Sequence, residues 1–171
     1  MLLVDGYNVL NAWPEVALLK EEDLAHARDR LIAILSEFHA LCGIRIILVF
    51  DAHQVRGGTE RREECGGIEV IFTREGESAD QWIEKFVSQA RANSPGKAVP
   101  IFVTTSDWLE QRIVSALGAY RVTPSELHLE LRRLKKESEK YTCENFDRIP
   151  LGNHLSEQIK SIFEGWRRLK N

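Results

Sequence analysis

The stretch LLVDGYNVLNAW, residues 2–13, decides the fold, because its apolar start leads directly into an acid. Its first three residues form an unalternating apolar run, which is typical of a strand that is buried on both faces. Asp5 stands where this strand would end. A carboxylate at the end of a buried strand indicates either a turn that uses its oxygens or a functional site.

Four further apolar runs resemble this first strand, and amphipathic stretches separate them. The predicted strands are 2–4, 45–50, 68–73, 100–105 and 120–122. Apolar residues at helical spacing predict helices over 23–42, 78–92, 106–117, 125–140 and 154–169. In the helix at 106–117, this spacing places Leu109, Ile113 and Leu117 on the apolar face. Alternation of strands and helices is typical of a parallel α/β sheet with right-handed crossovers. The sequence therefore predicts one α/β domain over 1–171, whose last 45 or so residues form basic helices.

Composition limits the class of protein further. The chain has 171 residues, a net charge of −3 and 29% charged residues, and no apolar run approaches the roughly 20 residues that cross a bilayer. We therefore expect no membrane partner. The three cysteines are widely spaced and form no CxxC motif, which disfavours a disulfide framework or a zinc knuckle. Reduced thiols fit a cytoplasmic protein, or one of the plastid stroma if a leader had been removed.

Acids recur where other predicted strands end or the following helices begin. They are Asp51, Glu77, Asp80 and Asp107. Any one of them could serve a turn or favour a helix N-terminus. Together with Asp5 they would converge, because ligands of open α/β sheets bind outside the carboxyl ends of the strands. Clustered carboxylates repel one another unless a cation compensates their charge, and oxygen ligands suit Mg²⁺ or Mn²⁺. The pattern predicts a divalent metal site.

Motifs for other chemistries are missing from the sequence. It has no GxGxxG or GxxxxGK[ST] loop, so we expect no nucleotide cofactor, and no GxSxG or HExxH motif. His53 follows Asp51 closely enough to be a candidate base, but a lone histidine is more often an ordinary loop residue. The pairs Gly57-Gly58 and Gly66-Gly67 are typical of turns.

Four blocks of sequence, together with a closing segment, resemble one protein family in both order and spacing. They are LLVDGYNVLNAW, LVFDAH, EVIFT with ESAD, VTTSD and the closing FEGWRR. The resemblance is to the YacP-like NYN domains, nucleases related to the PIN domains. It implies a Rossmann-like central parallel sheet in the order 3-2-1-4-5, flanked by helices, and metal-dependent endoribonuclease activity. Bacterial members are linked to cleavage of mRNA on the ribosome, which makes mRNA and the ribosome the expected partners.

The resemblance also implies which residues form the site. Asp5, Asp80 and Asp107 are expected to hold the metal, with Glu77 as a candidate further ligand, and Asn8 and Asp51 are expected beside them. Asn8 would bind a metal-bound water or orient Asp5, and Asp51 would bind a second ion or orient a water. Gly6 would let the backbone approach a phosphate closely, because it has no side chain.

Basic residues after position 120 suggest where RNA would dock. Residues 1–119 contain 12 Lys and Arg against 18 Asp and Glu, whereas 120–171 contain 11 against 8. The candidate RNA contacts are Arg132, Arg133, Lys135, Lys136, Arg167 and Arg168, with Arg56 as a second and weaker patch. Such contacts to phosphate give affinity without sequence specificity. A solvated helix face explains the same residues equally well.

Two other functions are compatible with the sequence. A non-catalytic module that binds RNA or the ribosome could keep the same fold, and it would bind without cleaving. A phosphohydrolase of small phosphate esters could use the same acidic metal site, and it would leave RNA intact.

Overall fold

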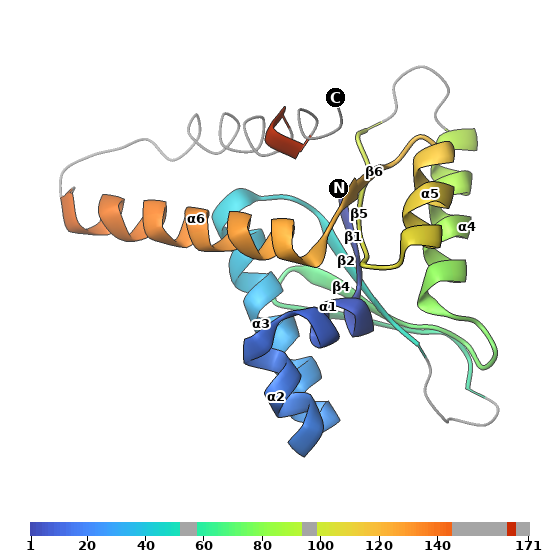
Figure 1. The fold of residues 1–171 in the computed structure, drawn as a ribbon, viewed down its shortest axis with the longest axis horizontal. Helices are drawn as coiled ribbons and strands as arrows, with labels where there is room; N and C mark the ends of the chain where they lie inside the picture. The colour runs from blue at the N-terminus through green and yellow to red at the C-terminus, as the bar shows by residue number, and fades with distance from the viewer. Residues whose placement is uncertain (52–57, 94–98, 145–163, 167–171) are drawn as a thin grey trace.

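A six-stranded sheet forms the centre of the protein. The computed structural model describes residues 1–51, 58–93, 99–144 and 164–166 (Figure 1). The strands are β1 (Leu2–Asp5), β2 (Ile46–Phe50), β3 (Arg61–Cys65), β4 (Ile68–Phe72), β5 (Phe102–Thr104) and β6 (Tyr120–Val122). Their order is β3-β4-β2-β1-β5-β6, and every pair is parallel except β3 with β4. The five predicted strands and their order are therefore confirmed, and β3 is added at one edge.

The extra strand β3 comes from a segment that sequence reasoning treated as a loop. Its residues, RREEC, are mostly exposed and carry no apolar alternation. It pairs with β4 because Gly66 and Gly67 have φ angles of 57° and 81°, a region that permits a tight hairpin turn. The predicted Gly66-Gly67 turn is thus confirmed, whereas Gly57 lies outside the described residues.

Helices cover both faces of the sheet (Figure 1). They are α1 (Gly6–Ala12), α2 (Pro14–Glu22), α3 (Leu24–Cys42), α4 (Ala79–Ala92), α5 (Trp108–Ala116) and α6 (Pro124–Glu144). On one face, Leu2 and Val4 pack with the core residues of α1, α3 and α6. On the other, Leu3 packs with those of α4 and α5. This burial on both faces explains why the first strand is apolar at three successive positions.

The helices agree with the predicted ones except at the two ends of the chain. α1 and α2 were not predicted; Asp5 caps α1, and Pro14 begins α2 at a position where a missing N–H costs nothing. Only 164–166 of the predicted helix at 154–169 is described, and it is helical. Among the described helices, none is long and apolar enough to cross a membrane.

Candidate metal site

Three carboxylates from distant parts of the chain meet at the carboxyl edge of the central strands. Asp5 ends β1, Asp80 lies in the first turn of α4, and Glu110 lies in the first turn of α5. One carboxylate oxygen from each lies within 4.8 Å of those of the other two. We call these three residues the acidic cluster. Asp5 and Asp80 were predicted to meet here, whereas Glu110 was not predicted.

Glu110 is the most informative member of the acidic cluster. It is 2% exposed, and both of its carboxylate oxygens are buried without a hydrogen-bond partner among the described residues. The pKa of Glu110 is raised to about 9, mainly by burial and also by the negative charges of Asp80 and Asp5, although the Thr105 side chain opposes the rise. An unpartnered buried carboxylate is costly unless it is neutral or faces a cation. The residues present therefore fit a bound divalent ion.

Asp5 shares this electrostatic environment. The pKa of Asp5 is raised to about 6, mainly by burial and also by the nearby charge of Asp80, although hydrogen bonds from Asn8 oppose the rise. The pKa values of Asp5 and Glu110 are raised for the same two reasons: each carboxyl group is removed from water, and each lies close to another acid. A divalent cation would relieve both effects at once.

Asn8 fixes the orientation of Asp5. Its backbone N–H donates to Asp5 Oδ1 over 3.0 Å, and its side-chain Nδ2 donates to Asp5 Oδ2. The Ser106 hydroxyl in turn donates to Asn8 Oδ1. Asn8 was expected either to bind a metal-bound water or to orient Asp5, and these hydrogen bonds support the second role.

Asp107 was predicted to hold the metal, but it is not one of the three residues of the acidic cluster. It is the N-cap of α5, and its Oδ1 accepts hydrogen bonds from the N–H groups of Leu109 at 2.7 Å and Glu110 at 3.1 Å. These bonds fix the helical turn that carries Glu110. A direct contact of Asp107 with a metal stays a prediction.

Asp51 positions the other helix of the site. Its Oδ1 accepts a hydrogen bond from the N–H of Ala79, the residue that precedes Asp80. Asp51 therefore ties the end of β2 to the start of α4. Its predicted contact with a second ion or a water is a separate role, and it stays a prediction.

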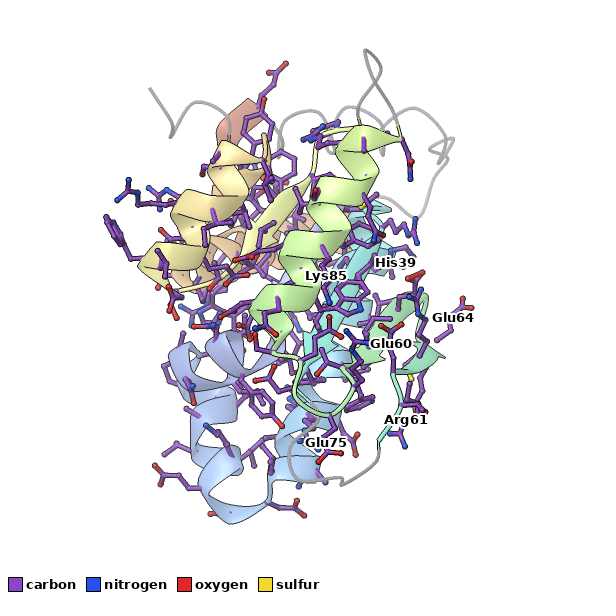
Figure 2. The ribbon with its side chains drawn as sticks, turned by 90° about the vertical axis from the view of Figure 1, so that its right-hand side faces the viewer. His39, Glu60, Arg61, Glu64, Glu75 and Lys85 are labelled. Atoms are coloured by element: carbon purple, nitrogen blue, oxygen red, sulfur yellow. The ribbon has the colours of Figure 1, made fainter. Side chains whose placement is uncertain are left out.

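Glu77 is buried, but its charge is already compensated. Its carboxylate contacts the Arg74 guanidinium at 3.1 Å and the Lys85 ammonium. These residues line an open cavity of about 470 Å³ that also includes Glu60 and Trp82. Figure 2 shows Lys85 of α4 and Glu60 on this face of the molecule. With two cations at its carboxylate, Glu77 has less need of a metal than Glu110.

Gly6 has a packing role that sequence reasoning missed. A Cβ added to Gly6 would lie 2.2 Å from Cε1 of the buried Phe50 ring. Only glycine fits this position, which accounts for the residue without any contact to phosphate. The predicted close approach of a phosphate stays a prediction.

The predicted RNA contacts fall partly on α6 and partly outside the described residues. Arg133 pairs with Glu130 and Glu137, and Lys135 pairs with Glu37. In the described part of the chain, no carboxylate pairs with Arg132 or Lys136. The four basic residues line an open cavity of about 630 Å³ on α6. His53, Arg56, Arg167 and Arg168 lie outside the described residues.

The fold and the site define the class of protein: it is an α/β domain with a largely buried cluster of carboxylates, able to bind a metal, at the carboxyl edge of its sheet. The model of the YacP-like NYN domain matches residues 2–168, and the chain belongs to this family. The family supports a nuclease-type, RNA-related function, as the sequence resemblance implied.

Known relatives agree over nearly their whole length. The chain is 41% identical to the uncharacterized protein YacP of Bacillus subtilis over 169 residues, which is 98% of this chain and 96% of that protein. It is also similar to a crystal structure of Rae1 (YacP) from Bacillus subtilis, with a TM-score of 0.66, 39% identity, and coverage of 98% and 94% of the two chains. A structure of a mutant of that protein gives a TM-score of 0.69, 37% identity, and coverage of 99% and 96%.

Proposed function

We propose that this protein is a metal-dependent endoribonuclease that hydrolyses phosphodiester bonds of mRNA in association with the ribosome. The observation that carries the proposal is the buried, unpartnered carboxylate of Glu110 facing Asp5 and Asp80. A Mg²⁺ or Mn²⁺ ion would allow this carboxyl to ionise beside Asp5 and Asp80, because its charge would compensate the repulsion among the three carboxylates. Family membership supplies the substrate class, since NYN domains are nuclease-type domains.

The residues of the site have two kinds of role: some would bind the ion, and others position the residues that bind it. Asp5, Asp80 and Glu110 would hold the ion. A divalent ion lowers the pKa of a bound water and stabilises negative charge on the leaving oxygen of a phosphodiester. Asn8 orients Asp5, Asp107 fixes the turn that carries Glu110, and Asp51 fixes the start of α4. Hydrolysis by water then needs no protein nucleophile.

The ribosome enters the proposal through the resemblance to bacterial members of the family. The exposed basic face of α6 supports it, because contacts to phosphate would bind mRNA or rRNA without reading sequence. The same face lies on a different helix from the acidic cluster, so docking and cleavage would use separate surfaces.

The test is cleavage of end-labelled mRNA by the protein in Mg²⁺ or Mn²⁺, with and without translating ribosomes. EDTA, Asp80→Asn and Glu110→Gln are the inactivating conditions, and Glu22→Gln, an exposed change at the end of α2, is the matched control. We expect discrete cuts that disappear with EDTA and with both site variants but persist with Glu22→Gln. RNA that is bound and never cut would favour the non-catalytic module. Hydrolysis of phenyl phosphate with RNA left intact would favour the small-ester phosphohydrolase.

A further inference from the structure

Trp108 is unusual among the tryptophans because most of it faces solvent. It is 66% exposed, whereas Trp13, Trp82 and Trp166 are between 1% and 6% exposed. Full burial of a large apolar side chain stabilises a fold by about 1.5–3 kcal/mol, and Trp108 forgoes most of this gain. Its exposure therefore calls for a role other than packing within this chain.

The position of Trp108 connects it to the acidic cluster. It is the first residue of α5, directly after the N-cap Asp107 and two residues before Glu110. Successive residues of a helix are about 100° apart, so Trp108 and Glu110 leave α5 on nearly opposite sides. The same turn thus directs a carboxylate into the acidic cluster and an indole to the other, solvent-facing side of α5.

Arg112 supplies a positive charge at the same place. Its guanidinium carbon lies 4.8 Å from the centroid of the Trp108 ring, at helical spacing i,i+4. Arg112 is exposed, and no carboxylate pairs with it in the part of the chain that the structure describes. This contact orders the indole and leaves a free cation beside it. Leu109, 61% exposed, extends the apolar surface.

We propose that Trp108 stacks on an unpaired base of the RNA, next to the nucleotide whose phosphodiester is held at the acidic cluster, while Arg112 contacts the adjacent phosphate. The inference rests on the proposed endoribonuclease function and adds to it the requirement for single-stranded RNA. An aromatic ring with a neighbouring cation matches a nucleotide, which combines an apolar base with a negative phosphate. Such stacking needs a base that is not already paired and stacked in a helix.

Trp108 and Arg112 together form a platform for RNA, and an acidic site gains from having such a platform beside it. The carboxylates that would bind a metal repel the phosphates of the substrate, so affinity for RNA must come from elsewhere. Stacking on Trp108 supplies affinity that does not depend on charge, and Arg112 supplies a local attraction. The platform therefore positions the strand without weakening the metal site.

The test measures binding of a single-stranded oligoribonucleotide by fluorescence anisotropy in the non-cleaving Asp80→Asn background. Trp108→Ala should weaken binding about tenfold, and Trp108→Phe should retain most of the affinity. Leu18→Ala, another change at an exposed apolar residue (69%), is the matched control and should leave binding unchanged.

A series of oligonucleotides with a single abasic site identifies the stacked base. With Trp108 present, one abasic position should weaken binding as much as Trp108→Ala does, and the two losses together should not add. Equal affinity of Trp108→Ala and its parent would overturn the inference, as would full additivity at every abasic position. A change in sedimentation of Trp108→Ala with unchanged RNA binding would assign the exposed ring to self-association and overturn it too. Absence of RNA cleavage by the protein with an intact site is a different result, because it would reject the proposed function itself.

Discussion

Asn8 binds both carboxylate oxygens of Asp5 at once. Its backbone N–H donates to Oδ1 over 3.0 Å, and its side-chain amide donates to Oδ2. Ser106, which follows β5, donates to the oxygen of that same amide, so Asn8 is fixed from both sides. The orientation of Asp5 therefore depends on contacts between the start of α1 and the segment that leads into α5.

Replacement of Asn8 by alanine should impair the site while the fold persists. The change removes the amide that orients Asp5 Oδ2, and loss of such a supporting contact typically lowers metal affinity or activity 10- to 100-fold. Mn²⁺ affinity by calorimetry and the rate of RNA cleavage would measure it. Asn11→Ala is the matched control, since Asn11 lies on the same helix and its side-chain oxygen accepts a hydrogen bond from Lys20, not from the site. Equal losses in both variants would show that α1, and not the Asp5 contact, is responsible.

Glu110 should make the metal-free protein less stable as pH rises. Its carboxyl keeps its proton to a pKa of about 9 in the folded protein, whereas the ordinary value is 4.5. Between these values the folded state binds more protons than the unfolded state, so the free energy of unfolding falls with increasing pH. The stabilising contribution is complete below pH 4.5 and is lost as pH approaches 9. The slope from one such group is at most about 1.4 kcal/mol per pH unit.

Urea denaturation in EDTA at a series of pH values from 6 to 9 would measure this slope. Glu110→Gln should flatten it and raise the stability at pH 8, because glutamine has no proton to lose when the protein unfolds. Glu22→Gln, at an exposed position, should leave the slope unchanged. A parent protein whose stability does not fall between pH 6 and 9 would contradict the raised pKa of Glu110.

Metal binding should release protons from the carboxyl groups of Glu110 and Asp5. At pH 7 the carboxyl of Glu110, with a pKa of about 9, is protonated, so a divalent ion must displace about one proton. Below pH 6 the carboxyl of Asp5 must also lose a proton. Mn²⁺ affinity should therefore rise about tenfold per pH unit between pH 6 and 9, and more steeply at lower pH. Calorimetry at pH 7 in buffers of different ionisation enthalpy counts the protons, and identical heats in all buffers would reject this linkage.

Most strands of the sheet were predictable because they are buried on both faces. Short apolar runs, most of them unalternating, predicted β1, β2, β4, β5 and β6, and the resemblance implied their order. Strand β3 has no such pattern, since its stability comes from backbone pairing across the Gly66-Gly67 turn. Exposed charged residues in an edge strand carry little information about secondary structure.

The site was predictable only where an acid follows a strand or begins a helix. Glu110 was missed because the apolar pattern of α5 was assigned to the face of Leu109, Ile113 and Leu117, whereas the structure buries Glu110 and Val114. Leu109 is 61% exposed. A signal existed in the spacing, since Glu110, Val114 and Leu117 share one side of a helix. A carboxylate on a buried face is difficult to recognise, because charged residues normally define the solvent side.

Gly6→Ala should destabilise the protein through a clash with Phe50. The added Cβ would lie 2.2 Å from the ring, which is fully buried and packed against Tyr7 and Phe72. Overpacking of this kind costs about 1–3 kcal/mol, measurable by urea denaturation. The double variant Gly6→Ala with Phe50→Leu tests the cause: the alanine should cost less stability in the Phe50→Leu background than in the parent. If the alanine costs as much stability in both backgrounds, position 6 needs glycine for its backbone conformation and not for the space beside the Phe50 ring.

Arg132 should contribute more to RNA binding than Arg133, although the two are neighbours on α6. Arg133 already pairs with Glu130 at 2.5 Å and Glu137 at 3.3 Å, whereas no carboxylate pairs with Arg132 among the described residues. An unpaired arginine contacts a phosphate without first breaking an ion pair. Arg132→Gln should therefore weaken binding of mRNA or ribosomes, and Arg133→Gln should weaken it less.

The salt dependence of binding distinguishes a phosphate contact from a general change in charge, since both variants remove one positive charge. Each lost contact to a single strand lowers the slope of log affinity against log salt by about 0.7. We expect this decrease for Arg132→Gln, with a smaller one for Arg133→Gln. Equal slopes for the parent and Arg132→Gln would show that this face of α6 is only solvated. Equal decreases for the two variants would show that net charge, and not the pairing state of each arginine, determines the affinity.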